Sequence, residues 1–60
     1  MDSLTNSELL PGSFVINQDN NDWGIGQIQS SIKDFVTVNF ENVGKKVINI
    51  KEINLELIEL

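Results

Sequence analysis

The run Phe35-Val36-Thr37-Val38-Asn39-Phe40 is the most regular stretch of this 60-residue chain. Apolar and polar residues alternate along it, so that Val36, Val38 and Phe40 share one face. This alternation is typical of a β-strand with one face in a core and the other toward solvent. The stretch therefore predicts a strand in the middle of the fold.

Four further stretches are short, rich in β-branched or alternating apolar residues, and separated by turn signals. We expect strands at 13–17, 23–30, 45–50 and 54–58, with a tight connection at 32–34. Pro11-Gly12 and the polar segment 18–22 predict turns, and Gly24 and Gly26 inside the second strand predict a sharp bend. A helix is the alternative for the C-terminus, since Leu57 and Leu60 stand three residues apart.

Five short strands without a long helix predict an all-β fold. Closing the sheet into a small barrel leaves few exposed edges, so we expect a five-stranded barrel over 11–60. Residues 1–10 are expected to form a short flexible N-terminal arm, because Pro11-Gly12 follows too soon for more than one helical turn. The side chains expected to point inward are Val15, Ile28, Val36, Val38, Phe40, Ile48, Leu55 and Leu57.

Composition narrows the possible functions. The chain is 40% hydrophobic and 22% charged, as in ordinary globular domains, and it has no Cys to form disulfides or thiolate metal sites. It also has no His or Tyr, and its four basic residues are all Lys, so nucleophiles activated by His are excluded. We expect no enzymatic activity and no cofactor.

The segment Asp19-Asn20-Asn21-Asp22 carries the oxygen ligands that Ca²⁺ prefers. An EF-hand register starting at Asp19 places Trp23 at a ligand position and Ser30 at the closing Glu. The pattern therefore favours a polar turn, and we expect no metal site.

Nine acidic residues against four Lys give a net charge of −5. This charge disfavours phosphate backbones, and without Arg the chain has no bidentate phosphate ligand. Weak nucleic-acid binding through Lys45, Lys46 and Lys51 is an alternative function.

Protein binding is the main prediction. Alternation sends several large apolar side chains to the outer face of the sheet, where a contiguous patch would be a docking or self-association surface. Trp23 is either a partner contact or a cap on the open end of the barrel, and a methyl-lysine cage is disfavoured because too few aromatic residues converge. The residues expected to contact a partner are Trp23, Phe14, Ile16, Ile25, Phe35 and Ile58.

Five motifs occur in order between about residues 11 and 58. They are Pro11-Gly12-x-x-Val15, Trp23-Gly24-x-Gly26-x-Ile28, Val36-x-Val38-x-Phe40, Gly44-x-Lys46-x-Ile48 and Leu55-x-Leu57. Together they resemble the small Tudor-like domain at the C-terminus of UvrD/PcrA-type bacterial helicases. The chain is also similar to a family of short stand-alone bacterial proteins of unknown function. It departs from the helicase pattern at Trp23, where Phe is common.

The resemblance implies an SH3/Tudor-like barrel and a role as an adaptor. Its implied partners are RNA polymerase or the DNA-repair and transcription machinery. The N-terminus has neither a basic region nor a long apolar run, so we expect a cytoplasmic protein. A homo-oligomeric structural module is a further alternative.

Overall fold

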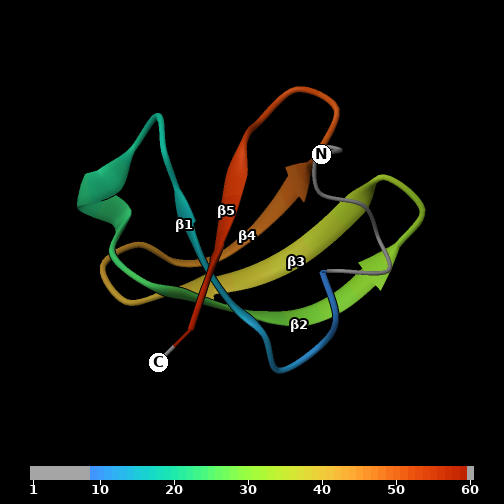
Figure 1. Cartoon of the computed structure of the whole chain (residues 1–60), viewed down its shortest axis with the longest axis horizontal. Helices are drawn as coiled ribbons and strands as arrows, with labels where there is room; N and C mark the ends of the chain where they lie inside the picture. Colours follow the sequence, from blue (N-terminus) through green and yellow to red (C-terminus); the bar gives the residue numbers. More distant parts are fainter. Residues whose placement is uncertain (1–8, 60) are drawn as a thin grey trace.

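The computed structural model describes residues 9–59, which form five strands and one short 3-10 helix (Figure 1). The elements are β1 (Phe14–Asn17), η1 (Asn21–Trp23), β2 (Gly26–Ile32), β3 (Phe35–Phe40), β4 (Gly44–Asn49) and β5 (Leu55–Ile58). All strands belong to one antiparallel sheet with the order β4-β3-β2-β1-β5. The prediction of an all-β fold with five strands is confirmed. No described residue belongs to a helix able to cross a membrane.

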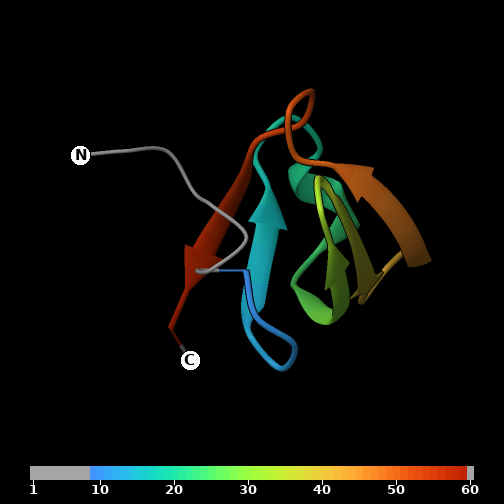
Figure 2. The same ribbon diagram turned by 90° about the vertical axis from the view of Figure 1, so that its right-hand side faces the viewer.

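The sheet curls so that β1 and β5 lie side by side across from β3 and β4 (Figure 2). Inward side chains fill the space between these two layers and form the hydrophobic core. Seven of the eight residues expected to point inward are buried, and the eighth, Leu57, is half-buried against the same core. The buried seven are Val15, Ile28, Val36, Val38, Phe40, Ile48 and Leu55.

Two further side chains within residues 9–59 are fully buried. Leu9 belongs to the hydrophobic core although it falls within the expected arm, 1–10; the rest of that arm before Leu9 lies outside the described residues. Asn17 ends β1 facing inward, and its Oδ1 accepts a hydrogen bond from the Asp19 N–H at 3.0 Å. This bond starts the turn that leads to η1, as Asn side chains commonly do.

The sheet is not closed by hydrogen bonds, which corrects the expectation of a complete barrel. The two edge strands are β4 and β5, and strands alternate in direction across the sheet, so these two edges run in the same sense. A parallel pair needs a connection of about a dozen residues or more, whereas only residues 50–54 join β4 to β5. The chain therefore closes its core with side chains instead of a fifth pairing between strands.

The C-terminal helix alternative is wrong. Residues 55–58 pair with β1 in a register that sets Val15 opposite Leu57 and Asn17 opposite Leu55. Leu55 thus reaches the core as a strand residue, with Glu56 facing solvent. Period-two alternation prevails over the spacing of three between leucines because the core lies on one side of this segment.

The second strand differs from its expected range of 23–30. Trp23 ends η1 instead of starting the strand, because its N–H donates to the Asn20 carbonyl at 3.0 Å. At the other end, β2 continues to Ile32, and only Lys33 and Asp34 form the turn to β3. Lys33 adopts a left-handed conformation with φ 54°, as two-residue hairpin turns require.

A β-bulge in β2 changes which residues face the core. The register with β3 shifts between Ile28 and Ser30, so that Gln29 is the extra residue. Ile28 is buried opposite Val38, but beyond the bulge Ile32 lies opposite the exposed Phe35. A bulge inserts one residue into a pattern of period two, and it therefore reverses the facing of everything after it.

Gly26 lies at an inward position of β2, opposite Phe40. A Cβ added there would lie 2.7 Å from two atoms of the Phe40 ring and would also overlap the Val38 side chain. Both neighbours are buried in the core. The position therefore requires glycine so that β3 side chains can pass over the backbone of β2.

We predict that Gly26→Ala destabilises the domain by about 1–3 kcal/mol, the usual cost of overpacking a core. Urea denaturation followed by circular dichroism measures the change. Gln29→Ala, at an exposed position of the same strand, should leave the midpoint nearly unchanged. In Gly26→Ala/Val38→Ala the smaller residue relieves part of the overlap, so the double variant should lose less stability than the sum of the two single changes. Strict additivity would contradict the assigned overlap.

Candidate functional site

One row of side chains crosses the outer face of the whole sheet. Successive cross-strand pairs join Lys45 to Asn39, Asn39 to Gln27, Gln27 to Phe14 and Phe14 to Ile58. Opposite residues in antiparallel strands have Cβ atoms about 5 Å apart, so neighbours in the row are within contact distance. The row therefore sets two amide side chains between an aromatic ring and an ammonium group.

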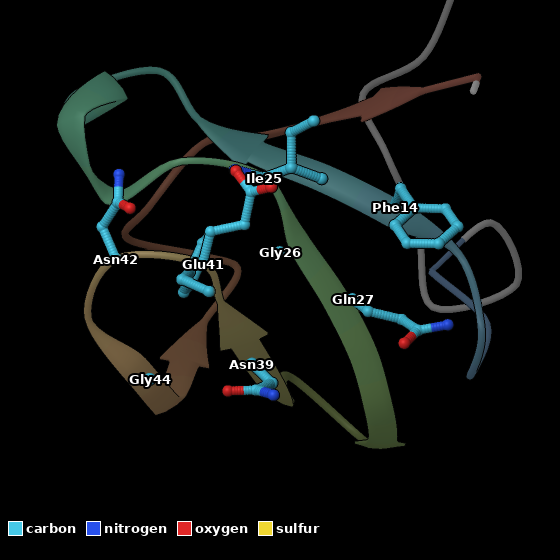
Figure 3. A pocket seen from close by; sticks show the side chains of 9 residues that line it. Phe14, Ile25, Gly26, Gln27, Asn39, Glu41, Asn42 and Gly44 are labelled. Atoms are coloured by element: carbon cyan, nitrogen blue, oxygen red, sulfur yellow. The ribbon is translucent and has the colours of Figure 1, made fainter.

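A hollow of about 500 Å³ opens on this face beside the middle of the row (Figure 3). It lies between β1, the start of β2, the end of β3 and the turn that leads into β4. The residues that line it are Phe14, Ile25, Gly26, Gln27, Asn39, Phe40, Glu41, Asn42 and Gly44. Its volume lies within the range of about 300–1,000 Å³ that is usual for ligand pockets.

Two loops frame the hollow, and hydrogen bonds fasten them together. The Glu41 N–H donates to the Ile25 carbonyl at 2.9 Å, and the Ile25 N–H donates to Oε1 of Glu41 at 2.9 Å. Asn42 adds two more bonds, from its N–H to the Trp23 carbonyl at 3.0 Å and from its Nδ2 to the Asp22 carbonyl at 2.8 Å. These four bonds hold the rim in one geometry.

The same bonds orient the amide groups around the hollow. Nδ2 of Asn42 donates to the Asp22 carbonyl, and Nε2 of Gln27 lies 3.4 Å from the Gly12 carbonyl. Figure 3 shows the amides of Gln27, Asn39 and Asn42 around Glu41. Gln27 and Asn42 each keep an oxygen and one further N–H for a bound group, and the Glu41 carboxylate has acceptors only.

Trp23 packs at the end of the core next to this hollow. Its ring meets Phe40 edge to face, with centroids 5.1 Å apart and planes at 68°, and Nζ of Lys46 lies 5.2 Å from the Trp23 ring centre. The side chain is half-buried against the core, which fits the cap interpretation. The ring thus already has an aromatic neighbour and a cation from within the chain.

A separate apolar patch lies at the other end of the sheet, on the outer face of β2, β3 and β4. Ile32 is 68% exposed, Phe35 53% and Val47 67%. Ile32 and Phe35 are direct cross-strand neighbours, and Val47 lies two pairs farther along β4, opposite Thr37 and on the same face. We call these three residues the outer patch.

The structure divides the residues expected to contact a partner. Phe14 and Ile25 line the hollow, Ile58 is opposite Phe14, and Ile16 lies on the same outer face of β1, each half-buried. Phe35 lies in the outer patch instead, four residues along β3 from the Asn39 of the row. The expected single surface is therefore two surfaces.

Several residues of both surfaces escaped the sequence analysis. Ile32 was expected in a turn and Val47 was not singled out, although Val47 alternates with the predicted inward Ile48. The amides of Gln27, Asn39 and Asn42 gave no signal, because polar residues at exposed strand and turn positions are ordinary. Only the pairing of the strands brings them together.

The lysines of the nucleic-acid alternative do not form one strip. Lys45 and Lys46 are consecutive strand residues and so point to opposite sides, with Lys45 in the outer row and Lys46 over Trp23. Lys51 pairs with Asp34, with 3.4 Å between Nζ and Oδ2. A phosphate backbone in contact with one of these lysines would therefore not pass along the other two.

We predict that Trp23→Ala lowers the free energy of unfolding by about 2 kcal/mol or more, because it removes a large ring and its contact with Phe40 from a small core. Trp23→Phe keeps an aromatic contact and should retain most of that stability. Urea denaturation followed by circular dichroism at pH 7 makes the comparison. An alanine variant as stable as the parent would indicate that Trp23 is only a surface residue.

A scan against family models matched residues 9–58 to a protein family of unknown function, DUF3553. Comparison with curated proteins and with solved structures gave no match. The match spans all five strands and begins at Leu9, the first buried residue of the described chain. The chain belongs to the DUF3553 family of small proteins of unknown function.

Proposed function

We propose that this chain is a non-catalytic, cytoplasmic protein-binding adaptor that docks through the outer patch. The observation that carries the proposal is the exposure of Ile32, Phe35 and Val47, each more than half accessible, close together on one face of the sheet. Exposed apolar side chains that are grouped in this way are a common feature of protein interaction sites. Single exposed residues scattered over a surface would carry no such meaning.

The position of the outer patch at the edge of the sheet favours a protein partner. Val47 belongs to β4, an edge strand whose outer side has no neighbouring strand in the sheet. A partner segment laid along this edge gains backbone hydrogen bonds while its side chains contact Val47 and Phe35. We expect the ring of Phe35 to contribute most of the binding free energy of such a contact.

The composition supports a role without catalysis. The sequence has no His, Cys or Tyr, and the hollow is lined by amides, apolar groups and one carboxylate. A net charge of −5 also favours a protein surface over a phosphate backbone. Binding is the function that these groups are equipped to perform.

The nature of the partner rests on the sequence resemblance. The motifs shared with the Tudor-like domain of UvrD/PcrA-type helicases suggest an SH3/Tudor-like fold, and five antiparallel strands in one curled sheet are compatible with it. By that resemblance, the proposed partners are RNA polymerase or proteins of DNA repair and transcription. A stand-alone module of this kind would link such a complex to another component.

We predict that Phe35→Asp abolishes capture of the partner from a nuclease-treated bacterial lysate, because a charge is placed at the centre of the apolar contact. Leu10→Asp is the matched control, since Leu10 is 54% exposed, nearly the same as Phe35, but lies outside the outer patch. Circular dichroism confirms that both variants fold.

Equal capture by the parent and Phe35→Asp would contradict docking through the outer patch. Loss of all captured protein after nuclease treatment would favour the nucleic-acid alternative. Sedimentation of the purified chain over a concentration series separates both results from self-association.

A further inference from the structure

We infer that the hollow beside the Gln27–Asn39 pair receives the guanidinium group of an arginine side chain that the protein partner presents. This inference rests on the proposed function, since it assigns a second contact to the same protein partner. The two surfaces lie on the same outer face of the sheet, with the hollow near one end of β3 and the outer patch near the other. One partner that covers this face of the sheet reaches both.

The first argument is the hydrogen-bonding character of the walls. Gln27 and Asn42 direct their NH₂ groups to the Gly12 and Asp22 carbonyls. Each of these amides keeps its oxygen and one further N–H for a ligand, and a carboxylate such as Glu41 has only acceptors. In these three side chains the acceptor sites outnumber the remaining N–H groups, which favours a bound group with several N–H donors, and a guanidinium has five in a planar fork.

The second argument is charge. Among the described residues that line the hollow, Glu41 has the one ionisable side chain, and the whole chain carries −5. Its carboxylate accepts the Ile25 N–H through Oε1, but two carboxylate oxygens offer about four lone-pair sites, so capacity for a cation remains. Lys45, the cation nearest by register, lies opposite Asn39 and is not among the lining residues. The hollow is thus complementary to a cation.

The third argument is shape. Phe14 and Ile25 form apolar walls, and the methylene stem of an arginine packs on such surfaces while its head remains hydrogen-bonded. A planar guanidinium also stacks on an aromatic face, here that of Phe14. A phosphate or a carboxylate would meet acceptors and a negative charge instead.

The fourth argument is preorganisation. The four hydrogen bonds between the segments 22–25 and 41–42 fix the rim before a ligand arrives. Binding then costs little ordering of the protein, because the acceptors are already in place. The arrangement is that of a receptor for one extended side chain.

The experiment is an NMR titration of the ¹⁵N-labelled chain with three blocked peptides, acetyl-Gly-Ser-X-Ser-Gly-amide, in which X is arginine, lysine or citrulline. Citrulline keeps the shape of arginine but lacks its charge. We expect the arginine peptide to shift the side-chain amide signals of Gln27 and Asn39 and the backbone signals of Gly26 and Gly44. The citrulline peptide should bind about tenfold more weakly, the effect of losing a hydrogen bond to a charged group.

Two matched variants locate the binding. Glu41→Gln keeps an oxygen for the Ile25 N–H but removes the charge, and it should weaken arginine binding about tenfold. Glu56→Gln removes the charge of another exposed carboxylate that also accepts a hydrogen bond, from Gln18 at 3.1 Å, and should change the affinity less than about twofold.

Equal binding of the arginine and citrulline peptides, signal shifts confined to other parts of the sheet, or an unchanged affinity in Glu41→Gln would each overturn the inference. Equal binding of the lysine peptide would overturn the assignment to a guanidinium. If the arginine peptide fails but capture still depends on Phe35, the hollow inference fails alone. If the arginine peptide binds at the hollow and the parent captures no protein, only the proposed function fails.

Discussion

The Phe40 ring lies across the backbone of β2 at the one core position that has no side chain, Gly26. The same ring meets Trp23 edge to face, so a single aromatic side chain joins β3, β2 and the end of η1. In a chain of 60 residues without disulfides, a few such rings account for much of the apolar surface that folding removes from water. The loops that frame the hollow leave directly from this contact: Glu41 follows Phe40, and Ile25 precedes Gly26. The geometry of the candidate site is therefore a consequence of how the core packs.

The open sheet determines the second surface, the outer patch, as the core packing determines the hollow. Because a short connection prevents β4 and β5 from pairing, the fold keeps two edge strands. Edge strands invite unwanted pairing, and charged residues are a usual protection. Here Lys45 and Lys46 lie on β4, and Glu56 lies on β5. Val47 interrupts this row of charged residues on β4, and it belongs to the outer patch together with Ile32 and Phe35. A surface that is charged along its edges and apolar at one place is suited to selective contact and to solubility at the same time.

Local pattern was a good guide wherever the core lies on one side of a strand. The alternation in 35–40 correctly set Val36, Val38 and Phe40 inward, and most of the remaining core followed from the same rule. Boundaries were less accurate, since hydrogen bonding around Asn20 and Asn21 makes Trp23 the end of a 3-10 helix. The site was harder to foresee than the fold. The amides of the hollow come from three different segments, and nothing in the sequence states which of them become neighbours.

The sequence by itself determined the fold class, the number of strands and nearly all of the core, because burial of one strand face leaves a direct record in residues two apart. Tertiary structure alone decided how the strands pair, where the bulge falls and that the barrel stays open. The bulge at Gln29 reverses the phase of β2, so Ile32 reaches the surface beside Phe35 although simple alternation from Ile28 would bury it. A one-residue shift in pairing leaves no visible mark in the sequence pattern. It nevertheless turns residues after the bulge from the core face of the strand to the outer face, or the reverse.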